Sequence, residues 1–196
     1  MSKETARDIL LEAGRKTFLE KGFNGAGLEG ILRTTGIPKG SFYYYFGSKE
    51  EFALEVLNRF DERKGKELDR ILGDESHSPL NRLRRYFESL RDCLEARECR
   101  EGCLVGNLSQ EMADHSEAFR ERLERIFEGW VDRLAVCLAQ ARELGEVEAS
   151  VDVRDLAEFW LNSWQGAMLR AKTMRSSAPL ETFLHVVFGS IGRPLA

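Results

Sequence analysis

Apolar residues recur at helical spacing along almost the whole chain, and this periodicity restricts its fold more than any other feature. Leu80, Leu83, Phe87, Leu90 and Leu94 follow one another at intervals of three or four residues. That spacing places side chains on one face of an α-helix. No segment shows the apolar–polar alternation of a half-buried strand, and only four of the 196 residues are proline. The pattern predicts an all-α fold of about nine helices.

In the N-terminal part of the chain, glycine and proline stand where the helices of a helix-turn-helix would end and begin. One helix is predicted from Lys3 to Lys21, with Gly22 as its stop, and a short second helix ends at Gly36. Pro38 then restarts the chain into a third helix. Two short helices joined by a tight glycine-containing turn make a helix-turn-helix.

Several later helices are expected to begin at capping residues. Ser48 and Glu51 have the spacing of a capping box and open a long helix. Asp114 and Glu117 have the same spacing before another long helix. Asp152 is expected to cap the eighth helix through its carboxylate.

Composition limits the classes of partner. No stretch approaches the roughly 18 consecutive apolar residues of a membrane span, and the N-terminus lacks the apolar core of a signal peptide. We therefore expect a cytoplasmic protein with no membrane partner. The net charge is −4, but residues 1–50 hold eight Lys/Arg against six Asp/Glu, which leaves 21 against 27 for the remainder. The small basic excess coincides with the predicted helix-turn-helix, where phosphate neutralisation would need it.

The segment from Gly36 to Phe52, GIPKGSFYYYFGSKEEF, resembles the DNA-binding signature of TetR/AcrR-type transcriptional regulators. Its physical logic agrees, because Gly40 allows the backbone to approach duplex DNA closely and tyrosine hydroxyls can reach phosphates. A helix cannot point three consecutive tyrosines into one core, so at least one faces outward. Gly27 stands where many members have a threonine that caps the second helix, and the phosphate contact of that threonine is not carried over.

The resemblance assigns roles within this segment. By that resemblance, the first and third tyrosines and Lys49 contact backbone phosphates, whereas Lys39, Ser41 and the middle tyrosine face bases. Phe42 and Phe46 are expected to pack inward. The predicted DNA-binding residues are Lys39, Gly40, Ser41, Tyr43, Tyr44, Tyr45 and Lys49.

Domain organisation follows from the same resemblance. Residues 1–50 are expected to form the DNA-binding domain, and residues 51–196 a helical domain that senses an effector and forms a homodimer. Two-fold symmetry would match a pseudo-palindromic operator read by paired recognition helices. The small residues expected at close helix packing in the dimer are Ser163, Gly166, Ala167, Gly189 and Ser190. The expected partners are a double-stranded DNA operator, a small-molecule effector and a second copy, with no cofactor.

A second resemblance is narrower. The segment from Gly102 to Ser109, GCLVGNLS, with Glu111 downstream, looks like that of the N-ethylmaleimide reductase repressor group within the family, in which the matching cysteine senses electrophiles or oxidants. It implies that Cys103 is a sensor. A helix N-terminus stabilises a thiolate, and Arg97 or Arg100 would add positive charge. The alternative is a structural Cys103 packed at a helix start, with a non-covalent apolar effector.

The remaining cysteines and the histidines bear on whether the chain forms a disulfide, binds a metal or acts as an enzyme. Cys99 is a possible disulfide partner of Cys103, and Cys93 and Cys137 are expected to be buried. The histidines, His77, His115 and His185, show no ligand spacing with the cysteines, so no metal is predicted. A thiol enzyme is a remote alternative, because no histidine stands beside Cys103 in the sequence, and the protein is predicted not to be an enzyme.

Large apolar side chains on the later helices are candidates for an effector pocket, since helical bundles place ligands between their helices. The same residues equally suit an ordinary core. The candidates are Phe87, Phe127, Trp130, Trp160, Trp164 and Met168.

Overall fold

The computed structural model describes residues 5–190, apart from the side chain of Ser190. Nine α-helices and no strands occur within these residues, which confirms the all-α prediction. Lys3, the predicted start of the first helix, and the Ser190 side chain lie outside the described part. The helices are α1 (Ala6–Gly25), α2 (Leu28–Thr35), α3 (Lys39–Tyr45), α4 (Lys49–Leu72), α5 (Pro79–Glu95), α6 (Leu104–Met112), α7 (Glu117–Glu143), α8 (Val153–Met174) and α9 (Ala178–Ser190).

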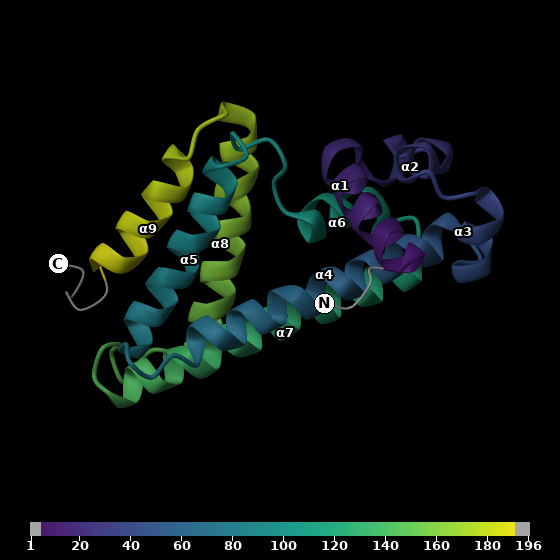
Figure 1. Cartoon of the computed structure of the whole chain (residues 1–196). Coiled ribbons are helices and arrows are strands. Elements are labelled where there is room, and N and C mark those ends of the chain that lie inside the picture. The colour runs from purple at the N-terminus through teal and green to yellow at the C-terminus, as the bar shows by residue number, and fades with distance from the viewer. Residues whose placement is uncertain (1–4, 191–196) are drawn as a thin grey trace. The chain divides into compact units, whose positions relative to one another are not determined.

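The chain divides into two compact units. Unit 1 comprises Met1–Arg63 and Cys103–Glu124, and unit 2 comprises Lys64–Gly102 and Arg125–Ala196. In unit 1, α2, α3 and α6 pack against α1, close to the N-terminal part of α4 (Figure 1). In unit 2, α9 packs against α5 and α8 (Figure 1). The functional boundary predicted near residue 50 is a different division and stays a prediction.

An aromatic cluster forms the core of unit 1. Phe42 of α3 lies 5.3 Å from Phe46 and 5.3 Å from Phe52 between ring centroids, and Phe18 of α1 lies 5.8 Å from Phe52. All four rings are at most 1% exposed. Tilted and edge-to-face contacts of this kind add to the free energy gained by removing the rings from water. The cluster fixes α3 to α1 and α4.

Helix α1 ends differently from its prediction. Gly22 does leave the helical conformation, with φ 70° and ψ −179°, but helical turns resume and continue to Gly25. Its N-terminus is closed by a capping box in which the Thr5 hydroxyl accepts from the Asp8 N–H and Asp8 accepts from the Thr5 N–H. Helix α1 is therefore kinked at Gly22, and its last turn leads to α2.

The predicted caps agree with the structure only in part. Asp152 accepts hydrogen bonds from two N–H groups of α8, as predicted. At α4, the Ser48 hydroxyl accepts from the Glu51 N–H at 3.0 Å, but the Glu51 carboxylate accepts from the Gly47 N–H, one residue further back than a capping box requires.

The Asp114 cap is wrong. The hydroxyl of Ser116 accepts from the Phe119 N–H at 3.3 Å at the start of α7. Asp114 lies in the turn before the helix and is too far upstream to cap it. Asp and Ser are both good N-cap residues, and the capping-box spacing from Asp114 to Glu117 pointed to the wrong one of the two.

Aromatic packing also organises unit 2. Phe87 of α5 lies 5.1 Å from Trp164 of α8 and 5.0 Å from Phe183 of α9 between ring centroids. Phe188 packs on Trp160 at 5.2 Å. The five rings join the three helices into one core. No helix of residues 5–190 combines the length and apolarity needed to cross a membrane.

Candidate DNA interface and sensor segment

A tight turn joins α2 to α3. Gly36 adopts the left-handed conformation, φ 68° and ψ 11°, directly after the last residue of α2. This region is unfavourable for residues with a Cβ, so glycine suits the position. Pro38 then precedes α3, and its carbonyl accepts from the Ser41 N–H at 2.9 Å. The predicted helix-turn-helix is present.

Helix α3 has one buried face and one exposed face. Phe42 is fully buried and Phe46 is 1% exposed, as predicted. Tyr44 is 82% exposed and Tyr43 50%, whereas Tyr45 is half-buried. Large exposed aromatic side chains lower the solubility of a folded surface unless they serve a contact. The outward tyrosines are therefore available to a partner.

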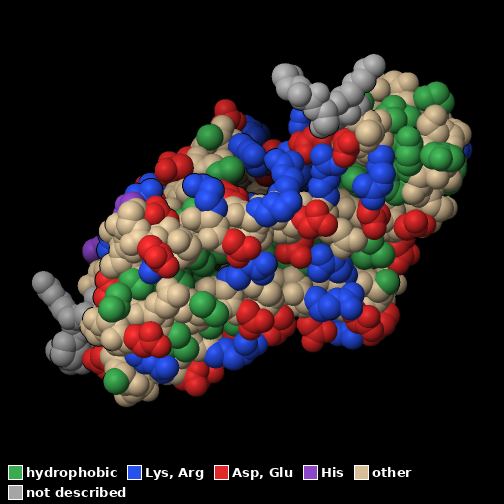
Figure 2. Space-filling model, turned by 60° about the horizontal axis from the view of Figure 1, so that its bottom comes forward, with side chains coloured by type: hydrophobic (Ala, Val, Ile, Leu, Met, Phe, Trp, Pro, Cys, Tyr) green, Lys and Arg blue, Asp and Glu red, His purple; other side chains and the backbone are tan. Residues whose placement is uncertain are grey.

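The other predicted contact residues of α3 surround this aromatic pair. Lys39 and Gly40 are exposed at its N-terminal turn, and Ser41 is half-buried. A Cβ built at Gly40 would meet no atom within 4 Å, so the backbone there is open to a close approach. On the face drawn in Figure 2, basic and acidic side chains are interspersed.

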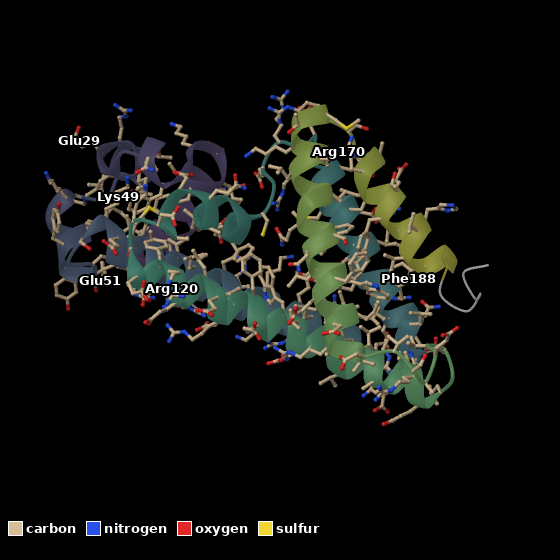
Figure 3. The ribbon with its side chains drawn as sticks, turned by 180° about the vertical axis from the view of Figure 1, so that it is seen from behind. Glu29, Lys49, Glu51, Arg120, Arg170 and Phe188 are labelled. Atoms are coloured by element: carbon tan, nitrogen blue, oxygen red, sulfur yellow. The ribbon has the colours of Figure 1, made fainter. Side chains whose placement is uncertain are left out.

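Lys49, another predicted DNA-binding residue, is half-buried and its side chain contacts the end of α1. Its Nζ donates to the carbonyl oxygen of Phe23 at 2.5 Å and lies 4.3 Å from the centroid of the Phe23 ring (Figure 3). Burial lowers the pKa of Lys49, and the nearby charge of Glu111 acts in the opposite direction. In this structure the ammonium therefore stabilises the end of α1, a long-range contact that sequence spacing does not reveal.

Helix α2 begins without a side-chain cap. Gly27 is its N-cap residue and makes no side-chain hydrogen bond. Because glycine has no side chain, none caps the first N–H groups of α2 at this position.

Cys103 is the N-cap residue of α6, with φ −97° and ψ 125°, and it is half-buried. The chain reaches it through three residues with positive φ, Glu98 at 53°, Cys99 at 51° and Gly102 at 72°. Two of these are not glycine, and a left-handed residue with a Cβ costs about 1–2 kcal/mol. The thiol thus follows a strained segment and lies at the N-terminus of a helix.

The positive charges expected near Cys103 are engaged elsewhere. Arg97 pairs with Glu101 at 2.7 Å, and Arg100 pairs with Glu98 at 2.7 Å. Each of the two guanidinium groups therefore has a carboxylate partner, and their effect on Cys103 stays a prediction.

The other cysteines differ in access. Cys93 is exposed, so its predicted burial is wrong, because it lies on the solvent side of α5. Cys137 is buried, as predicted, and its thiol donates to the Pro79 carbonyl at 3.3 Å. Cys99 is 3% exposed, and burial raises the pKa of its thiol. All four residues are thiols in this structure.

The structure places five of the six predicted pocket residues in two groups. Phe87, Trp160 and Trp164 belong to the aromatic core of unit 2. Phe127 and Trp130 form a second pair on α7, with ring centroids 5.6 Å apart. Met168 is 8% exposed. Among the described residues, the indole N–H groups of Trp130 and Trp164 are buried without a hydrogen-bond partner. Such orphan donors are uncommon in folded proteins.

A helix-turn-helix with an exposed aromatic and basic second helix, in an otherwise all-helical chain, defines a DNA-binding transcriptional regulator. The comparisons with known proteins agree. A model described as "Bacterial regulatory proteins, tetR family" matches residues 10–56, and one described as "Tetracyclin repressor-like, C-terminal domain" matches residues 79–187. The chain belongs to the TetR family.

Similar proteins extend this result over the whole chain. The "HTH-type transcriptional repressor DhaR" of Mycobacterium sp. (strain GP1) is 38% identical over 97% of this chain and 94% of its own. The "HTH-type transcriptional repressor NemR" of Escherichia coli is 32% identical over 99% of both. Its solved structure, "Crystal structure of E.coli NemR reduced form", has a TM-score of 0.86 and covers 97% of this chain and 98% of that one. These relatives are regulators, so the protein is not an enzyme, and it is similar to the NemR group.

Proposed function

We propose that this protein is a repressor that binds a pseudo-palindromic operator as a homodimer and leaves it when an effector binds or when Cys103 is modified. The observation that carries the proposal is the exposed face of α3, where Tyr43, Tyr44, Lys39 and Gly40 lie together beside a buried aromatic core. Relatives named as repressors support this direction of regulation.

The proposed DNA contacts divide into two kinds. Lys39, Ser41 and Tyr44 read base edges, and Tyr43 and Tyr45 contact phosphates that fix the register. Lys49 would have to leave the Phe23 carbonyl to reach a phosphate. Its contact therefore belongs to the bound state rather than to the free protein.

Dimerisation is proposed through α8 and α9. Phe159 and Leu169 of α8 are 62% and 54% exposed, and Val186 of α9 is 55% exposed. Phe159, Gly166 and Leu169 are spaced so that they share one face of α8. Apolar side chains of this size on packed neighbouring helices favour burial against a second copy.

Release through Cys103 is one route. Its position at the N-terminus of α6 favours a thiolate, which is the form that attacks an activated alkene: the sulfur bonds to the β-carbon and the α-carbon takes up a proton. Release through a non-covalent effector is the second route. The orphan indole N–H groups of Trp130 and Trp164 support it, because they would suit an apolar ligand that carries a hydrogen-bond acceptor.

The test is binding to the DNA upstream of the protein's own gene, at fixed salt, with and without N-ethylmaleimide. Because exposed Cys93 will also be alkylated, Cys93→Ser serves as the background and is compared with Cys93→Ser/Cys103→Ser. If the reagent releases Cys93→Ser from DNA but leaves Cys93→Ser/Cys103→Ser bound, the thiol route is supported. Retention of both makes Cys103 structural and favours a non-covalent effector. If the wild-type protein binds no DNA, the proposed function is wrong.

A further inference from the structure

The last turn of α1, after the kink at Gly22, is held from two sides within unit 1. The Asn24 N–H donates to Oε2 of Glu111, on α6, at 3.0 Å. The carbonyl of the preceding residue, Phe23, accepts from Lys49 Nζ, on α4, at 2.5 Å. Helices α6 and α4 thus hold consecutive backbone groups of the same turn.

The carboxylate of Glu111 is seated directly against the backbone. Gly22 has φ +70°, and a Cβ built there would overlap the Glu111 carboxyl group. Glycine is therefore favoured at this position for two independent reasons, its left-handed conformation and the space that the carboxylate occupies. The kink in α1 and the placement of Glu111 belong to one local arrangement.

This turn leads directly into the DNA-reading helices. Ala26 is fully buried two residues after Asn24, and Gly27 is the N-cap of α2. Helix α2 lacks a side-chain cap of its own, so its start is defined by the turn that precedes it. Because α2 packs against α3, the position of the turn influences where α3 is presented.

We propose that Glu111 is a positioning residue for DNA binding: by accepting from the Asn24 N–H, it fixes the last turn of α1, which leads into α2, to α6 and thereby orients the helix-turn-helix. This inference rests on the proposed DNA-binding function and adds a residue to it. Glu111 lies eight residues after Cys103 on α6, about 12 Å along the helix axis. A displacement of α6 at its N-terminus therefore reaches the helix-turn-helix through this contact.

A competing account gives Glu111 no positioning role. A carboxylate near bound DNA repels phosphates, and its removal would then strengthen binding in proportion to the lost charge. The two accounts predict opposite signs for Glu111→Ala. They also differ for Glu111→Gln, which removes the charge but keeps an oxygen that can accept from the Asn24 N–H.

The experiment measures affinity for the same upstream DNA duplex at fixed salt for wild type, Glu111→Ala, Glu111→Gln and Gln110→Ala. Gln110 is the exposed neighbour on α6 and serves as the matched control. We expect Glu111→Ala to bind about fivefold to tenfold more weakly, as for loss of one charge-assisted hydrogen bond. We expect Glu111→Gln to stay within about twofold of wild type, since the hydrogen bond is retained.

Hydrogen exchange gives a readout that needs no DNA. The exchange rate of the Asn24 amide, followed by NMR, should rise in Glu111→Ala and not in Gln110→Ala. Affinity equal to or above wild type in Glu111→Ala overturns the proposal, as does an unchanged Asn24 exchange rate. If wild type binds no duplex, the proposed function fails and the positioning role falls with it, whereas the exchange result still reports whether the contact forms.

Discussion

At the scale of single residues, different side chains of α3 serve the stability of the fold and the proposed contact with DNA. Phe42 is fully buried among other rings, and Tyr44, two positions along, is 82% exposed. We expect Phe42→Ala to lower the free energy of unfolding by about 3–5 kcal/mol, because it leaves a cavity. Tyr44→Ala should leave it within about 0.5 kcal/mol and weaken DNA binding by about 1 kcal/mol or more. Thermal unfolding and a DNA titration on both variants check this, and equal melting temperatures would contradict it.

The Cys137 thiol gives stability a pH dependence at the alkaline end. Burial raises its pKa from 9.0 to about 11, with Arg82 acting in the opposite direction. The folded state keeps this proton where the unfolded chain loses it, so the stabilisation is complete below pH 9 and is lost as the pH rises through about 11. The free energy of unfolding should fall over this range in wild type and less steeply in Cys137→Ser. Urea denaturation at stepped pH measures both slopes, and identical slopes would remove the thiol as the cause.

At the scale of secondary-structure elements, the start of α1 depends on Asp8. Hydrogen bonds from Thr5 and Arg59 lower the pKa of Asp8 from 3.8 to about 2. A lowered pKa means that the stabilisation is present above pH 3.8 and is lost as the pH falls through about 2. We expect Asp8→Asn to be less stable than wild type at neutral pH and the difference to shrink on acidification. Circular dichroism with denaturant at each pH tests this; a pH-independent difference would show that packing, not charge, is responsible.

Periodicity was sufficient to predict the helices, because it reports which face of each element is buried. Helix geometry also predicted that at least one of the three consecutive tyrosines faces outward, whereas the inward Phe42 was implied by the family resemblance. The direction of Lys49 and the contact of Glu111 with Asn24 could not be predicted. Both depend on backbone groups brought close by the tertiary fold. The cap at Ser116 was missed, because the capping-box spacing pointed to Asp114.

At the scale of the whole molecule, regulation requires two states with different affinities for DNA and for the signal. Helices α4 and α7 each contribute residues to both compact units, as α4 does on either side of Arg63. Three residues separate the end of α3 from the start of α4, so α3 is joined to the helix that contributes to both units by a short non-helical segment.

The last prediction at this scale concerns the proposed dimer interface on α9. Val186→Glu places a charge on an apolar face of α9 that is 55% exposed in the single chain. If that face is buried between two copies, the unpaired charge costs several kcal/mol on each side of the two-fold axis. We expect the variant to sediment as a monomer and to lose operator binding, because one α3 then contacts one half-site alone. Leu144→Glu, which changes a side chain that is 68% exposed after α7, is the matched control and should stay dimeric. Analytical ultracentrifugation distinguishes the outcomes, and a dimeric Val186→Glu protein would place the interface elsewhere.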